Sequence, residues 1–197
     1  MLLLDTSQHP VEDRDEILRA GISELAGLDL APVDGDELMN LRFRAWDMGD
    51  GCSLLHSQST GLNLTRPPSR GCNDGPPVLG FAMMPAGGAR FSQHDRQDIV
   101  PPGGMSIVEM NDPFTFNFAS RSSEGINFQV PLEVLDVPLG EVRIAAEFLP
   151  LSPVYPLARQ HLMALLRYTA KFGAPQPCAQ QAALHVIRAL VKSFRTD

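Results

Sequence analysis

The sequence has few cysteines and no long apolar run. Cys52, Cys72 and Cys178 are widely spaced and form no Cys-x-x-Cys pair, so neither a disulfide framework nor a cysteine-ligated zinc site is indicated. Glycine, proline or charge interrupts the apolar runs within about ten residues, well short of the roughly 20 that a transmembrane helix needs. The start, Met-Leu-Leu-Leu-Asp, has neither the basic region nor the apolar length of a secretory signal. We therefore expect a soluble, cytoplasmic protein with reduced thiols and no membrane contact.

Motifs of common catalytic and cofactor sites are also missing. A metal centre built on a β-strand typically uses two histidines separated by one residue, so that both side chains point to the same face. The five histidines, none of which has such a neighbour, are His9, His56, His94, His161 and His185. The sequence also has no Gly-x-Ser-x-Gly elbow and no phosphate-binding loop ending in Gly-Lys-Ser/Thr. We expect no enzyme activity, no metal and no cofactor.

Charge is distributed unevenly along the chain. The first 149 residues carry ten basic and 22 acidic side chains, whereas residues 150–197 carry six basic ones and a single acid, Asp197. An acidic body is repelled by phosphate backbones, so this part of the chain is a poor nucleic-acid binder by itself. The basic residues near the C-terminus are expected on the solvent faces of helices.

The most regular part of the sequence is residues 87–116, where short apolar segments alternate with turn residues. Pro102-Gly103-Gly104 combines the fixed φ of proline with the freedom of glycine, and Asn111-Asp112-Pro113 offers side chains that hydrogen-bond to their own backbone. Evenly spaced short strands are typical of a small closed β-barrel or jelly roll. The expected strands are 42–48, 53–57, 60–66, 78–84, 89–93, 98–100, 105–110, 114–119 and 126–130.

Three helices are expected outside the strands. Residues 12–28 repeat apolar side chains at helical spacing, with acidic residues near the start. Residues 157–172 and 179–194 are amphipathic, and Gly173 and Pro175 between them predict an antiparallel helical hairpin. The expected organisation is an N-terminal arm and helix over 1–38, a barrel over 39–150 and a helical subdomain over 151–197. The fold class is therefore mainly β with α, and the loop at 66–77 is too rich in proline and glycine for regular structure.

Several of these turn and packing residues carry a family resemblance. They are Gly87, Gln93, Arg96, Pro102-Gly103, Pro113-Phe114, Arg66-Pro67 and Phe128-Gln129-Val130-Pro131. Over Asp15 to Phe194 the chain resembles the N-terminal, ligand-binding domain of AraC/XylS-type transcription regulators. The resemblance implies a cupin-like jelly roll that binds an effector, followed by helices that form a homodimer.

The same family reads DNA through a C-terminal domain with two helix-turn-helix units. The chain stops at Thr196-Asp197, where a linker to such a domain would begin. We therefore expect an excised or naturally truncated sensor domain, in which DNA binding belongs to the absent part.

The candidate effector site is the barrel lumen. A lumen lined by phenylalanine and methionine either fills itself or leaves a cavity for an apolar or aromatic small molecule. The expected pocket residues are Trp46, Phe81, Met83 and Phe128. His56 is either a polar contact in this lumen or a half-buried histidine bound to its neighbours.

The candidate dimer contact is the apolar stripe of the last helix. It contains Leu184, Ile187, Leu190, Val191 and Phe194, and it is broad enough to leave apolar surface after the helix covers the barrel. Two alternatives to a sensing domain remain at this stage. One is a small cupin-type enzyme, and the other is a purely dimerising domain with a barrel filled by its own side chains.

Overall fold

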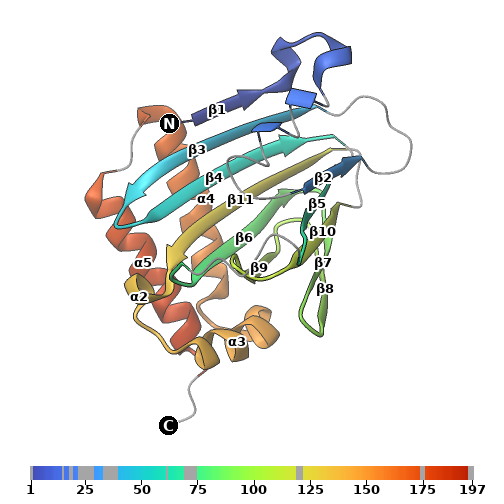
Figure 1. The fold of residues 1–197 in the computed structure, drawn as a ribbon. Helices are drawn as coiled ribbons and strands as arrows, with labels where there is room; N and C mark the ends of the chain where they lie inside the picture. The colour runs from blue at the N-terminus through green and yellow to red at the C-terminus, as the bar shows by residue number, and fades with distance from the viewer. Residues whose placement is uncertain are drawn as a thin grey trace.

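The structure is a computed structural model that describes residues 2–14, 16–17, 20–21, 29–32, 40–60, 62–68, 75–118, 122–173 and 176–194. Its described strands form two antiparallel sheets that face each other (Figure 1). The first sheet, in spatial order, is β1 (Leu2–Asp5), β3 (Leu41–Gly49), β4 (Cys52–Ser59), β11 (Ser123–Pro131), β6 (Val78–Ala86) and β9 (Met105–Glu109). The second is β2 (Asp29–Pro32), β5 (Leu62–Arg66), β10 (Phe114–Phe118), β7 (Ala89–Gln93) and β8 (Arg96–Val100).

The helices follow the strands in the chain and lie on the outer side of the first sheet (Figure 1). They are α2 (Leu132–Leu135), α3 (Leu139–Phe148), α4 (Tyr155–Phe172) and α5 (Pro177–Lys192), with short 3-10 helices at Thr6–Gln8, Val11–Asp13 and Leu149–Leu151. Gly173 ends α4 with a φ of 79°, and its N–H donates to Thr169 O at 2.8 Å. Glycine fits this left-handed C-cap without strain.

Two separate apolar cores lie on the two faces of the first sheet. One, between the sheet and the helices, includes Trp46, Phe81, Phe128, Leu162 and Ile187. The other lies in the lumen between the two sheets and includes Leu41, Met84, Phe91, Val108 and Phe116. In the first sheet, β6 is therefore buried on both faces over Leu79–Met84.

Two turns that the sequence predicted can be compared with the structure. Gly103 has a φ of 74°, and Gly104 N donates to Pro101 O at 2.7 Å, which confirms the predicted Pro102-Gly103 reversal. At the second predicted turn, the Asn111 side chain accepts from Val78 N at 2.8 Å on β6. It thus bonds to a neighbouring strand rather than to its own turn.

The predicted jelly roll with a C-terminal pair of antiparallel helices is confirmed. The helix expected at 12–28 falls largely outside the described residues; in that range, Val11–Asp13 close a 3-10 turn and positions 14, 16, 17, 20 and 21 are helical. The sequence patterns did not predict α2 and α3 within 39–150, nor β1 and β2. No helix in the described ranges is long and apolar enough to cross a membrane.

Candidate functional site

A cavity of about 100 Å³ lies in the lumen between the two sheets. Most of its wall is apolar, and its aromatic part comes from Phe43 of β3 and from Phe114, Phe116 and Phe118 of β10. Phe116 packs on Phe91 with the ring centroids 4.6 Å apart, so this side of the lumen is well filled. Ala82 and Met84 of β6 and Val108 of β9 form the opposite wall. The lumen is therefore only partly filled by its own side chains.

The polar part of the cavity wall comes from β4 and β11. It consists of Ser57, Ser59, Asn127 and Gln129. Ser59 Oγ lies 2.9 Å from Ser123 Oγ, and Gln129 Oε1 accepts from Ser53 Oγ at 3.1 Å. Asn127 differs, because its Oδ1 is buried and has no hydrogen-bond partner among the described residues. An unpaired buried acceptor is uncommon and calls for a functional explanation.

The predicted pocket residues lie on the other face of the same strands. Trp46, Phe81, Met83 and Phe128 are buried against α3, α4 and α5, in the core outside the barrel. Their assignment to the lumen is therefore wrong. They point to the helices, whereas residues next to them in the chain, such as Ala82, point into the lumen. Both faces of β6 are buried over Leu79–Met84, so the two-residue period could not tell the lumen face from the helix face.

His56 also points away from the lumen. Its Nε2 lies 2.7 Å from Glu124 Oε1, and the side chain is almost fully buried. The second interpretation of the sequence is therefore correct in that His56 is bound to a neighbouring side chain, but the histidine is more deeply buried than expected.

The predicted dimer residues are also buried within the subunit. Leu184, Ile187, Leu190 and Val191 are 2% exposed or less, and Phe194 packs against the same core. The expectation of a leftover apolar surface on α5 is wrong, because α3, α4 and the first sheet together cover the stripe.

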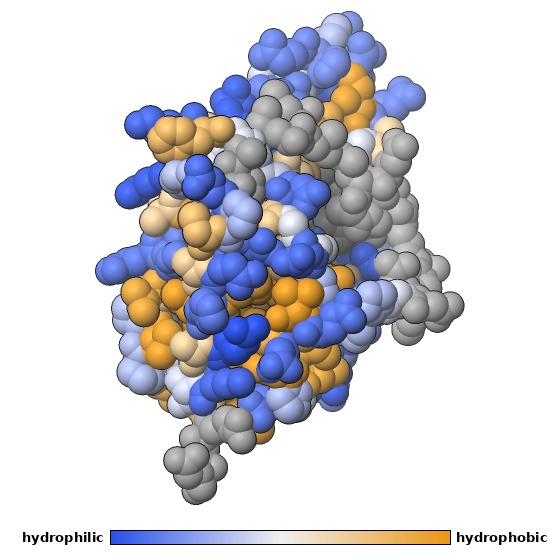
Figure 2. All heavy atoms as spheres, turned by 90° about the vertical axis from the view of Figure 1, so that its left-hand side faces the viewer, coloured by the Kyte–Doolittle hydropathy of each residue, from blue (hydrophilic) through white to orange (hydrophobic). Residues whose placement is uncertain are grey.

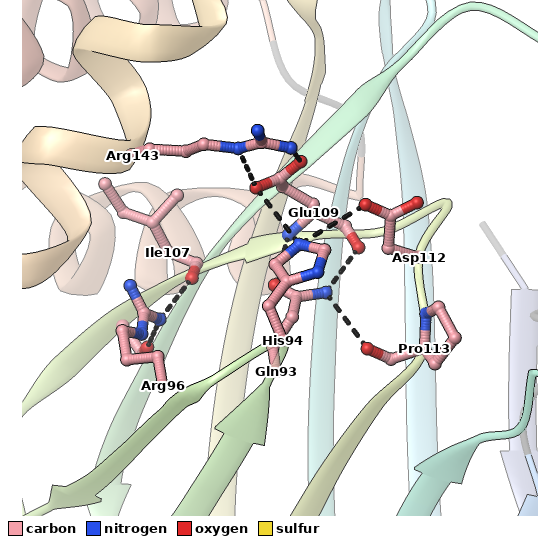
Figure 3. A network of polar contacts seen from close by, with 9 residues as sticks. Gln93, His94, Arg96, Ile107, Glu109, Asp112, Pro113 and Arg143 are labelled. Carbon is pink, nitrogen blue, oxygen red and sulfur yellow. Dashed lines mark hydrogen bonds and ion pairs between the residues drawn. The ribbon is translucent and has the colours of Figure 1, made fainter.

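A polar network lies outside the lumen, where β7 turns into β8 (Figure 3). Gln93 Nε2 donates to Glu109 O at 2.8 Å, and Glu109 N donates to Gln93 Oε1 at 2.9 Å. Arg96 Nη2 donates to Ile107 O at 2.8 Å, while its guanidinium lies over the Phe91 ring. Because β9 ends the first sheet and β8 ends the second, the Arg96 bond joins the two sheet edges, and the Gln93 bonds link β9 to β7, the strand next to the edge. Gln93 and Arg96, two residues of the family resemblance, thus close the barrel.

The Glu109 carboxylate is the centre of this network. Arg143 reaches it from α3 through two hydrogen bonds, of 2.9 Å and 2.8 Å, and His94 points toward it and toward Asp112 (Figure 3). Burial raises the pKa of Glu109, but the hydrogen bonds and charge of Arg143, with His94, outweigh burial and hold that pKa below its ordinary value. His94 has a φ of 51°, a conformation that is uncommon for a residue other than glycine.

His94, Glu109 and Asp112 could together hold a metal ion, since their ligand atoms lie within 4.8 Å of one another. Arg143, however, occupies both oxygens of Glu109, and its positive charge repels a cation. The geometry therefore favours an ion-pair network at this place. In the lumen, no His, Cys, Asp or Glu is among the described residues that line the cavity.

The two described cysteines are free thiols. Cys52 is buried and Cys178 is exposed. Burial raises the pKa of the Cys52 thiol, which makes it a poor nucleophile. Cys72 lies outside the described residues.

Comparison with known proteins shows a strong structural similarity to a transcriptional activator. Neither a protein-family model nor a curated protein matches the sequence. The crystal structure of the AraC-like transcriptional activator CuxR has a TM-score of 0.73 and 16% identity, over 100% of this chain and 71% of that chain. A cupin-2 domain from Rhodospirillum rubrum is 10% identical, over 52% of this chain and 69% of its own, with a TM-score of 0.34.

A cupin 2 conserved barrel domain protein from Rhodopseudomonas palustris is similar at the same low level, with 11% identity, a TM-score of 0.32, and coverage of 54% of this chain and 72% of its own. The CuxR match extends over the barrel and the helices together. The present chain therefore shares its overall fold, barrel and helices together, with the AraC-like transcriptional activator CuxR.

The lining of the cavity was missed by sequence reasoning, although a signal for it exists. Gly80 interrupts the bulky residues of β6, and a Cβ there would lie 2.8 Å from Asn127 Oδ1 and 2.7 Å from Met110 Sδ. A glycine inside a strand marks a close approach of another group. Gly80 thus indicates that positions 80, 82 and 84 of β6 face a different environment from positions 79, 81 and 83.

Proposed function

We propose that this chain is the effector-sensing part of an AraC-type transcriptional regulator, that it acts in the cytoplasm and that it is not an enzyme. The observation that carries the proposal is the structural likeness to CuxR over the whole chain, barrel and helices included. The apolar cavity between the sheets supports it, because a small-molecule site is concave, mostly apolar and furnished with a few polar groups. DNA binding would belong to a segment outside this chain.

The residue types that line the cavity do not favour the alternative of a cupin-type enzyme. A barrel enzyme that uses a metal needs converging histidine and carboxylate ligands. The described lining residues offer only serine, asparagine and glutamine as polar groups. These groups are suited to hydrogen-bonding a ligand, and none of them is a general base at neutral pH.

We also propose that the protein forms a homodimer, through a surface other than the one that the sequence indicated. The α5 stripe is taken up by the subunit's own core. Exposed apolar side chains instead lie at Ile144 and Phe148, one helical turn apart on α3, and at Leu151 in the following 3-10 turn. Figure 2 shows that apolar side chains lie among polar ones on the side of the molecule where the helices lie.

The regulatory proposal can be tested by transcript profiling in the cell that encodes this chain. Deleting the gene should change transcription from a defined set of promoters. Ala82→Leu places extra carbon atoms in the cavity, so the gene carrying it should restore those transcripts less completely than the parent gene. Ala86→Leu, at the exposed end of the same strand, is the matched control and should restore them fully.

Circular dichroism would show that both variants fold. A deletion that alters no promoter contradicts the regulatory role. Full restoration by a folded Ala82→Leu variant contradicts sensing through the lumen.

A further inference from the structure

The part of the lumen wall that the structure describes carries no charge. Its described residues are Leu41, Phe43, Leu55, Ser57, Ser59, Leu64, Ala82, Met84, Val108, Met110, Phe114, Phe116, Phe118, Gly125, Ile126, Asn127 and Gln129. None of these side chains ionises near neutral pH. A carboxylate or an ammonium group that entered this cavity would lose its hydration without gaining an opposite charge. The wall therefore selects uncharged molecules.

Among the described residues of this wall, Asn127 supplies the one buried polar atom that lacks a partner. Its Nδ2 contacts Met110 Sδ at 3.7 Å, a weak acceptor, and its Oδ1 has no partner among the described residues. The side-chain oxygens of Ser59 and Gln129 already lie at hydrogen-bonding distance from other side chains. The free group is a carbonyl oxygen, so a ligand satisfies it with an O–H or an N–H.

The Asn127 amide is held in place by its surroundings. Asn127 is central in β11 and pairs with Leu55 of β4 and Ala82 of β6. A Cβ built on Gly80 would lie 2.8 Å from Asn127 Oδ1 and 3.1 Å from its Nδ2, so the amide rests directly on the bare backbone of β6. Almost none of Oδ1 is exposed, so a ligand contacts it by displacing the flexible Met110 side chain that lies beside the amide.

The size of the cavity limits the ligand to about one ring. Its volume of about 100 Å³ is somewhat smaller than the engineered cavity of about 150 Å³ in another protein that takes up benzene. Met84 and Met110 line the wall, and flexible thioether side chains adapt to small changes in ligand shape.

We propose that the lumen binds a neutral ligand of about one ring that donates a hydrogen bond from a hydroxyl or N–H group to Asn127 Oδ1. This inference rests on the proposed sensing function and specifies the chemical class of the effector. Phenol is the simplest probe, since its hydroxyl remains protonated at pH 7. Toluene has the same size without the donor, and benzoate adds a negative charge.

The test is to titrate the purified chain with phenol, toluene and benzoate by ligand-observed NMR. The ratio of the toluene to the phenol dissociation constant should fall about three- to tenfold in Asn127→Leu, the factor expected for the loss of one hydrogen bond. Asn117→Leu makes the same replacement at an exposed position of β10 and should leave the ratio unchanged. Benzoate should bind at least about tenfold more weakly than phenol.

Ala82→Leu locates the binding, because it should weaken phenol and toluene together. An unchanged ratio in Asn127→Leu, benzoate binding as tight as phenol, or no binding of any probe at millimolar concentration would overturn the proposal.

These outcomes are separate from the transcript experiment. A wrong ligand class leaves the effect of the deletion and of Ala82→Leu on promoters intact, whereas a wrong function removes it even if phenol binds.

Discussion

At the scale of single residues, Glu109 connects three parts of the molecule. It ends β9, its backbone is bound by Gln93 of β7, and its carboxylate is bound by Arg143 of α3. The carboxylate side chain is only 15% exposed, so its ion pair is shielded from water more than a surface pair is. We therefore expect this residue to contribute to stability in a pH-dependent way.

The sign of that dependence follows from the lowered pKa of Glu109. The unfolded chain, in which this carboxyl has its ordinary pKa of about 4.3, binds the proton more readily than the folded chain does. The contribution is therefore complete above that value and is lost as the pH falls through the lower pKa of the folded state. Arg143, His94 and Asp112 are the charged or titratable groups that face it.

We predict that Glu109→Gln lowers the free energy of unfolding by about 1 kcal/mol at pH 7, because the charged hydrogen bonds to Arg143 are weakened. Urea unfolding at pH 7 and at pH 3.5 should show a smaller loss on acidification for this variant than for the parent. Glu133→Gln, at an exposed carboxylate on α2, is the control and should behave like the parent. Equal acid sensitivity of parent and Glu109→Gln would show that the pair contributes nothing.

At the scale of elements, α5 is a core helix of the subunit. Its stripe packs on α3, α4 and the first sheet, and Gln180 near its start donates to Gly49 O at 3.0 Å in the β3–β4 turn. Arg188 donates from the same helix to Leu135 O at 2.8 Å and so binds the end of α2. The helix is therefore attached at several points along its length.

We predict that Leu190→Ala lowers the free energy of unfolding by about 2 to 5 kcal/mol, because it leaves a cavity in a fully buried layer. Leu190 is 0% exposed, whereas Leu157 on α4 is 55% exposed. Leu157→Ala should therefore change stability by about 0.5 kcal/mol or less. Chemical unfolding followed by circular dichroism measures both, and similar losses for the two variants would contradict the burial of α5.

At the scale of the whole molecule, the oligomeric state is the property to be measured. A change of Leu190 to Glu would not test it, because a charge at this position would disrupt the subunit itself. The exposed apolar residues of α3 and the turn after it are the better target. Leu151 is 77% exposed, and Ile99 on β8 is 79% exposed on a different element.

We predict that the parent chain is a dimer at tens of micromolar and that Leu151→Glu weakens the dimer at least about tenfold, because the new charge would be desolvated in the contact. Ile99→Glu should leave the dimer intact. Light scattering over a dilution series distinguishes the outcomes. A monomeric parent, or a Leu151→Glu variant as dimeric as the parent, would contradict this assignment.

The sequence by itself determined most of the elements and their order. Alternation and turn chemistry predicted the nine strands from 42 to 130, and helical periodicity predicted the two C-terminal helices, because these signals are local. The same signals did not reveal α3, which lies within the range expected for the barrel. They also left His56 undecided between two environments.

Only the tertiary structure decided which face of each element meets which neighbour. Phe81 and Ala82 are both buried, yet the first contacts the helical layer and the second lines the lumen. Leu190 has the pattern of an interface residue and lies in the core, since three elements converge on one helix. A period of two or of 3.6 residues tells where apolar side chains point relative to one another, but which partner covers each face depends on contacts between residues far apart in the chain.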